Sequence, residues 1–111
     1  MPKLQFETTR NRTVAIVRPV GELDLSGAAV LEAELDRLVA DPDLATVVLD
    51  MRGLEFMDSS GLRLVVVADM KARDAGRRFS IVRGDETVHR VFEITRMSER
   101  LDFVDAPEDV G

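Results

Sequence analysis

The sequence predicts an α/β domain with a mixed central β-sheet and helices packed against it. Short segments of strand length, either apolar throughout or alternating, are interleaved with longer segments whose apolar residues recur at helical spacing. The resulting order is strand, strand, helix, strand, helix, strand, helix, with a short apolar run near the carboxyl end that could add a strand. This order is typical of α/β domains in which right-handed crossovers join parallel strands.

Length and composition limit the classes of protein to consider. The 111 residues form one expected domain, residues 1–111, with 45% hydrophobic and 32% charged residues and no cysteine, which excludes disulfides and thiolate metal sites. A net charge of -6 argues against nucleic acid as the main partner, because phosphate neutralisation requires a basic surface. Residues Met1–Gln5 lack the apolar core of a signal peptide, and no apolar run approaches membrane-spanning length. We therefore expect a cytoplasmic protein that does not insert into membranes and needs no metal or cofactor.

The first third of the chain predicts a hairpin and a helix. Leu4–Thr8 alternates as a half-buried strand does, and Thr13–Arg18 reads as a more buried strand that Pro19 ends. Gly21–Asp24 is then a turn-like link, and Ser26 is the better candidate to cap the following helix. The apolar face of that helix repeats at Leu31, Leu35 and Leu38, before Asp41-Pro42-Asp43 stops it.

The central stretch is the most informative part of the sequence. A buried strand, Val47–Leu49, is followed by Phe56–Leu62 and then by an apolar segment, Leu64–Met70, which predicts a helix ending at Gly76. That helix would open on Ser59 and Ser60, at the positive end of its dipole, where a negatively charged group is favoured as a ligand or as a covalent modification. Its apolar surface is wider than one stripe, so we expect it to be buried on more than one side.

The last third predicts a strand at Phe79–Val82 and a helix that opens at Asp85-Glu86. His89, the only histidine, is expected on the surface of this helix. Leu101–Val104 is a short apolar run, and the acidic tail, about residues 105–111, is expected to fray. The sequence has no internal repeat, low-complexity block or linker.

Both Gly21–Asp24 and Asp58–Gly61 are predicted strand-to-helix loops. Because sites in α/β sheets collect at the carboxyl ends of strands, the two loops could lie side by side, with Asp24 and Asp58 near the same serines.

Three catalytic interpretations fit the residues poorly, so no enzyme is expected. Ser59 or Ser60 as a nucleophile would need the G-x-S-x-G elbow, but Met57 stands at the first glycine position. A metal site made of Asp24, Asp50 and Asp58 matches no known ligand spacing, and there is no glycine-rich nucleotide loop. From composition and spacing alone, the simplest interpretation of Asp58-Ser59-Ser60 is a helix cap.

Three segments resemble a known family: Gly21–Asp24, Val47–Asp50 and Phe56–Leu62, the last reading F-M-D-S-S-G-L. In order and spacing they resemble the STAS family, specifically its small bacterial anti-sigma factor antagonists, over nearly the whole chain. The resemblance implies a single STAS-like domain that binds an anti-sigma factor with serine kinase activity and so frees a sigma factor.

The resemblance also implies roles for individual residues. The serine directly after the aspartate, Ser59, would be phosphorylated by the kinase, which ends the interaction, and a phosphoserine phosphatase would restore it. Asp24, Asp58, Ser60, Gly61 and Leu62 would contribute to partner binding. The alternative is a STAS adaptor that does not switch, a scaffold subunit of a larger signalling or transport assembly, in which Ser59 only begins a helix.

The chain departs from the family pattern at two places. Arg63 stands where a second glycine is frequent, and Thr95-Arg96-Met97 replaces a segment whose middle residue is often glycine. The first departure lies in the expected docking helix, and the second is expected to alter only a turn.

Overall fold

The computed structural model describes residues 4–110; Met1–Lys3, part of the segment weighed above as a signal peptide, and Gly111 lie outside the described residues. The elements in chain order are β1 (Leu4–Asn11), β2 (Val14–Leu23), α1 (Leu25–Val39), β3 (Thr46–Asp50), β4 (Leu54–Met57), α2 (Ser59–Asp74), β5 (Arg78–Val82), α3 (Glu86–Ile94), a 3-10 turn η1 (Met97–Glu99), β6 (Phe103–Val104) and a second turn η2 (Pro107–Asp109).

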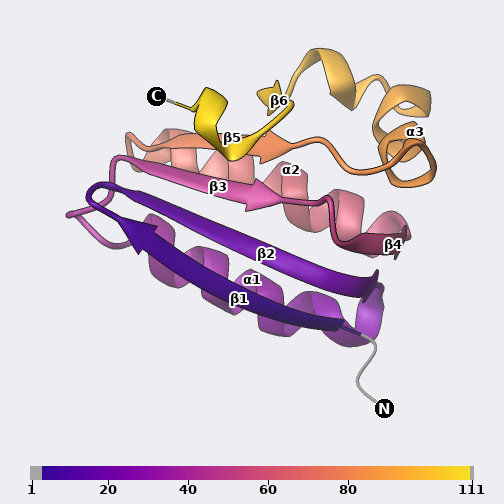
Figure 1. The fold of residues 1–111 in the computed structure, drawn as a ribbon, viewed down its shortest axis with the longest axis horizontal. Helices are drawn as coiled ribbons and strands as arrows, with labels where there is room; N and C mark the ends of the chain where they lie inside the picture. The colour runs from indigo at the N-terminus through magenta and orange to yellow at the C-terminus, as the bar shows by residue number, and fades with distance from the viewer. Residues whose placement is uncertain (1–3, 111) are drawn as a thin grey trace.

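The predicted mixed α/β sheet is confirmed, and its order is β1-β2-β3-β5-β6 (Figure 1). β1 lies at one edge and pairs antiparallel with β2, whereas the other neighbours are parallel. β2 pairs with β3 through Val17 and then with β4 from Gly21 onward. The sheet therefore divides at the point where β2 changes partner.

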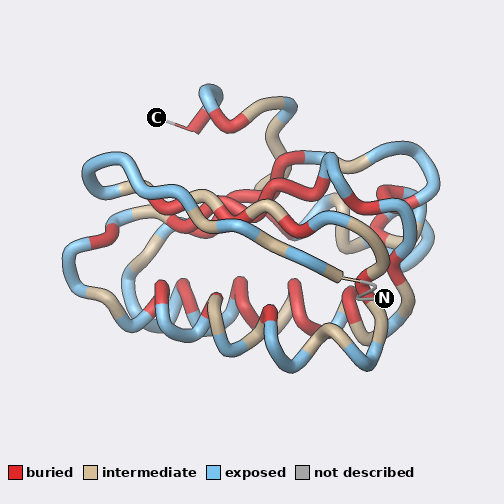
Figure 2. The backbone as a smooth tube through the Cα atoms, turned by 60° about the horizontal axis from the view of Figure 1, so that its bottom comes forward, coloured by how far each residue is buried: buried red, intermediate tan, exposed pale blue. Residues whose placement is uncertain are grey.

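Two layers make up most of the domain. α1 and α2 pack against one another and cover one face of the sheet, while the carboxyl-terminal segment crosses the other face (Figure 2). Leu31, Leu35 and Leu38 of α1 are buried, as their spacing predicts. α2 buries Leu64, Val65, Ala68 and Ala72, yet Met70 remains more than half exposed, so the wide apolar surface of α2 is only partly covered.

The prediction that Pro19 ends the second strand is wrong. β2 continues to Leu23, and Pro19 pairs with Phe6 of β1. Pro19 lies in the interval where β2 has left β3 and not yet joined β4, so its missing N–H interrupts neither parallel ladder. Gly21–Leu23, predicted as a turn, is strand with a register irregularity after Gly21, whose φ is 106°.

The sequence prediction also omits β4. This strand has only four residues, and its two central side chains, Glu55 and Phe56, are both exposed. It therefore has neither the alternation nor the continuous apolar run by which strands are recognised. Only pairing with β2 defines it.

The helix ends agree with the predictions more closely. α2 ends at Asp74, and Gly76 has the left-handed φ of 74° expected after a helix. α3 begins after its cap Asp85, whose carboxylate accepts a hydrogen bond from the amide of Val88 at 3.0 Å.

Two predictions for the last third differ from the structure. His89 is buried, not on the surface, because its ring packs edge-on against Phe103 at a centroid distance of 4.8 Å and beside Phe92. The acidic tail is not frayed over the described residues: it forms η2, and Val110 packs on Val48 and Val82.

Candidate functional site

The site begins with the amino end of α1. Its cap is Asp24, not Ser26, because the Asp24 carboxylate accepts hydrogen bonds from the Ser26 amide at 3.0 Å and from the Ser26 hydroxyl at 2.6 Å. Ser26 is therefore a donor to the cap rather than the cap itself. Gly27 follows in the first turn, packed closely on Leu4 of β1.

The amino end of α2 is built in the same way. Asp58 is its cap, and one carboxylate oxygen accepts hydrogen bonds from the amides of Ser60 at 2.8 Å and Gly61 at 3.4 Å. Ser59 is the first helical residue and is exposed, whereas Ser60 is half-buried. Of the two serines, Ser59 therefore presents the more accessible hydroxyl.

Strand pairing brings the two helix starts together, as the sequence predicts. Leu23 of β2 is the register partner of Met57 of β4, and the next residue of each strand caps a helix. The Asp58 amide donates to the Leu23 carbonyl oxygen at 3.2 Å. Asp24 and Asp58 thus lie at the ends of adjacent parallel strands, each followed by a helix start.

Gly61 and Leu62 hold α2 against this strand pair. Gly61 is buried, and a Cβ added there would overlap Met57 Cγ and lie 3.0 Å from Leu23. Leu62 is half-buried and packs on the main core. Both residues therefore help to position the start of α2 on the strand pair.

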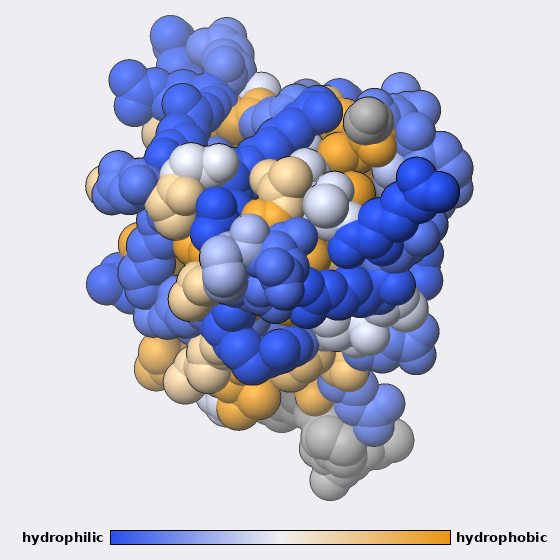
Figure 3. Space-filling view, turned by 90° about the vertical axis from the view of Figure 1, so that its left-hand side faces the viewer, coloured by the Kyte–Doolittle hydropathy of each residue, from blue (hydrophilic) through white to orange (hydrophobic). Residues whose placement is uncertain are grey.

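Two exposed apolar side chains at this end were missed by sequence reasoning. Leu25, the first residue of α1, is 78% exposed, and Phe56 on β4 is 46% exposed. The signal was present in the sequence: Asp24-Leu25-Ser26-Gly27 and Asp58-Ser59-Ser60-Gly61 share the pattern D-x-S-G, which places Leu25 at the position equivalent to Ser59. The opposite end of the molecule is mainly hydrophilic, with apolar areas between the polar side chains and along the lower edge of the view (Figure 3).

His89 and Asp50 have partners other than the serines and aspartates of the two helix starts. His89 lies on α3 between phenylalanines, and burial, with the charge of Arg83, lowers its pKa. Asp50 is bound by two arginines instead of joining Asp24 and Asp58. Within residues 4–110 no group of three or more His, Asp or Glu side chains is arranged to hold a metal ion.

The family model for the STAS domain matches residues 5–109. The chain belongs to the STAS family. Among curated STAS relatives, an anti-sigma F factor antagonist of Paenibacillus polymyxa is 28% identical over 102 residues, which cover 92% of this chain and 87% of that protein.

Solved structures of STAS proteins share the fold. An anti-sigma factor antagonist from Mycobacterium paratuberculosis superposes with a TM-score of 0.86 at 23% identity, covering 96% of this chain and 89% of that one. The unphosphorylated antagonist SpoIIAA gives a TM-score of 0.80 at 24% identity, with 95% and 90% covered. None of the helices in the described part of this STAS domain is both long and apolar enough to cross a membrane.

Proposed function

We propose that this STAS domain is an anti-sigma factor antagonist that binds an anti-sigma factor with serine kinase activity and is switched off by phosphorylation of Ser59. The supporting observation is the exposed Ser59 at the first position of α2, between its own cap Asp58 and the neighbouring capped start of α1. The expected class of partner, an anti-sigma factor, comes from the relative named as an anti-sigma F factor antagonist.

The local charges explain why a phosphate at Ser59 would act on the partner. Asp58 already accepts hydrogen bonds from two amides of the first turn, so few donors remain to hold a phosphate against the helix. A phosphoserine adds about -1.5 to -2 charges beside the carboxylates of Asp24 and Asp58. The new charge therefore stays at the surface, where a partner would have to cover or oppose it.

The exposed apolar side chains supply the attractive half of the interaction. Leu25 and Phe56 flank the helix starts, and apolar and aromatic side chains contribute most when an interface excludes water. Leu25 begins α1 and Ser59 begins α2, and the strands that lead into these helices, β2 and β4, are paired. A partner that buries Leu25 must therefore also approach Ser59. Phosphorylation would then weaken binding without altering the fold.

The test uses the purified domain and its anti-sigma partner, identified by co-purification. Incubation with the partner and ATP should phosphorylate Ser59, as located by mass spectrometry, and the phosphorylated form should bind at least about tenfold more weakly, a difference of 1.4 kcal/mol. A phosphoserine phosphatase should restore the affinity. Ser60→Ala is the matched control, because Ser60 is adjacent yet less exposed, and it should still be phosphorylated.

Equal affinity of the two forms, or phosphate at Ser60, would contradict the proposal. A stable complex whose partner neither has kinase activity nor responds to Ser59 would instead favour the scaffold that does not switch.

A further inference from the structure

The second feature of chemical interest lies on the face of the sheet opposite α1 and α2, where the sheet divides. β2 leaves β3 after Val17 and joins β4 at Gly21, and three residues separate the end of β3 from the start of β4. A hollow of about 270 Å³ opens at this division. All the residues that line it flank the division: Arg18, Pro19, Val20, Asp50, Arg52 and Gly53.

A buried carboxylate organises the hollow. The side chain of Asp50 is 3% exposed, and its Oδ2 accepts hydrogen bonds from Arg18 Nε at 3.0 Å and from Arg52 Nη2 at 2.9 Å. Its Oδ1 accepts from Arg52 Nε at 3.0 Å and from the Arg52 amide at 3.1 Å. Although burial opposes ionisation, the hydrogen bonds from Arg52 and Arg18 hold the pKa of Asp50 below its usual value.

Two guanidinium groups are thereby fixed next to one another. Both contact the same carboxylate oxygen, which holds the two guanidinium groups closer together than two free arginines would remain. Arg18 and Arg52 are still 43% and 49% exposed. Arg18 donates to Asp50 through Nε, which leaves its terminal nitrogens as donors for a ligand, and a guanidinium can bind an oxyanion through two parallel hydrogen bonds.

We propose that this hollow binds a small ligand that bears a phosphate or carboxylate group, held between Arg18 and Arg52. Both arginines are oriented before the ligand arrives, which lowers the entropy cost of binding. The exposed donors of the two guanidinium groups match the acceptor atoms of an oxyanion. The site is separate from the capped helix starts, since it is built from β2, the end of β3 and the turn that leads into β4.

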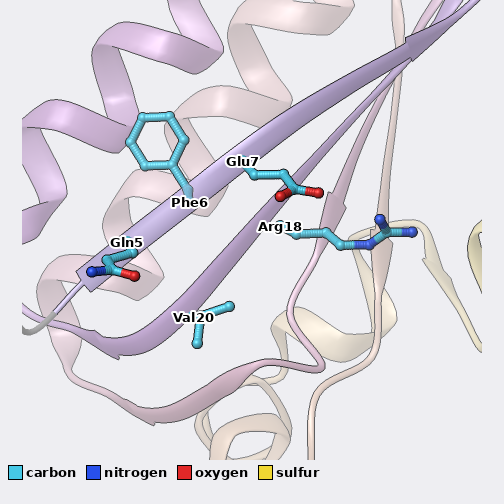
Figure 4. A pocket seen from close by; sticks show the side chains of 5 residues that line it. All are labelled: Gln5, Phe6, Glu7, Arg18 and Val20. Atoms are coloured by element: carbon cyan, nitrogen blue, oxygen red, sulfur yellow. The ribbon is translucent and has the colours of Figure 1, made fainter.

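The surrounding carboxylates define where on this face the ligand lies. Glu7 is the cross-strand partner of Arg18, and both project from the same side of the β1–β2 hairpin, with Phe6 on the other side (Figure 4). Glu7 lines a neighbouring hollow of about 350 Å³ that shares Arg18 and Val20 with the first. Its charge would repel an oxyanion, and so would that of Glu108, which acts electrostatically on Arg52 from the carboxyl-terminal segment. The ligand therefore belongs between the two arginines, away from both carboxylates.

The experiment titrates the isotopically labelled, full chain with inorganic phosphate and, separately, with succinate, each against sodium chloride of equal ionic strength. Nuclear magnetic resonance follows the side-chain Nε–Hε signals of Arg18 and Arg52 and the amides of residues 50–53. Saturable shifts of these signals with phosphate or succinate, and not with chloride, are the expected result; the anion that binds more tightly identifies the preferred group. Linear shifts, or shifts confined to the starts of α1 and α2, would overturn the proposal.

Variants separate the ligand site from the structural ion pair. Arg18→Gln should weaken binding about tenfold or more, because it removes charged donors. Glu7→Gln should strengthen binding severalfold by removing a like charge, and it leaves Asp50 and its arginines in place. Arg90→Gln, at an exposed arginine of α3, should leave the affinity unchanged. If Arg18→Gln does not fold, the titration of the wild-type protein and that of Glu7→Gln still test the proposal. Unchanged ligand affinity in Glu7→Gln would contradict the assigned position of the ligand.

Discussion

The backbone amide of Asp58 donates a hydrogen bond of 3.2 Å to the carbonyl oxygen of Leu23. This bond closes the pairing of β2 with β4 at the point where both strands end, and a helix starts directly after each. Because Asp24 follows Leu23, both capping carboxylates belong to one surface. The proposed switch depends on this relationship, since a partner at Ser59 must also meet the start of α1.

The first prediction concerns Ser59 itself. Ser59→Ala should bind the anti-sigma partner persistently and resist release by ATP, because the acceptor hydroxyl is gone while the cap Asp58 remains. Ser59→Asp should bind more weakly than wild type but more tightly than the phosphorylated protein, since one carboxylate has less charge than a phosphate. Titration calorimetry with and without ATP measures both effects. Release of the Ser59→Ala complex by ATP would contradict the assignment.

A second prediction separates the cap from the charge of Asp24. Asp24→Asn keeps a side-chain oxygen for the Ser26 amide, so the free energy of unfolding should change by less than about 0.5 kcal/mol, whereas Asp24→Ala should lose about 0.5–2 kcal/mol. The rate of Ser59 phosphorylation should nevertheless change in Asp24→Asn, because a surface charge near the acceptor governs recognition more than stability. Urea unfolding measures the first effect and a kinase assay the second. An unchanged rate of Ser59 phosphorylation would show that Asp24 acts only as a helix cap.

The packing of Gly61 supplies a third prediction. Gly61→Ala should destabilise the domain by about 1–3 kcal/mol, since the new methyl would overlap Met57 and press on Leu23. Gly27→Ala is the matched control at the equivalent position of α1. There the methyl would meet the side chain of Leu4, within 2.9 Å of Cδ2, on an edge strand that can adjust. Equal losses of unfolding free energy in the two variants would show that the packing at Gly61 is no tighter in effect than that at Gly27.

The buried His89 predicts a pH dependence of stability. Burial, reinforced by the charge of Arg83, lowers the pKa of His89 in the folded state. Its neutral form is thus favoured by folding, and this stabilisation is present above the unfolded pKa of about 6.5 and is lost as the pH falls below that value.

Wild type and His89→Leu, compared by urea unfolding at several pH values, isolate this contribution. As the pH falls below about 6.5, the wild type should lose up to about 1.4 kcal/mol per pH unit relative to the variant, the limit for one proton. Parallel curves over this range would show that His89 titrates equally in both states.

A fifth prediction concerns the turn after α3. Arg96 has a left-handed φ of 64°, a conformation that favours glycine. Arg96→Gly should therefore stabilise the domain by up to about 1 kcal/mol, measured as a raised melting temperature. Arg90→Gly, within α3, should have the opposite sign because glycine weakens a helix interior. Destabilisation in both variants would mean that the Arg96 side chain contributes more than its backbone costs.

Local sequence was sufficient for much of the fold. Asp58 before two serines and a long apolar run determines the start of α2, and Gly76 its end, because capping and left-handed turns depend on adjacent residues. Alternation identified β1, and apolar runs identified β3 and β5. The closeness of Asp24 and Asp58 also followed, since parallel strands end at one edge of a sheet.

The remaining features depended on residues distant in sequence. β4 exists only as a partner of β2, and Pro19 is tolerated within β2 only because the ladder changes partner there. His89 is buried because Phe103, fourteen positions later, packs against its ring. Arg18 and Arg52 meet on Asp50 because the sheet divides between them. Each of these contacts is made across strands or layers, and neither composition nor periodicity encodes which surfaces will face one another.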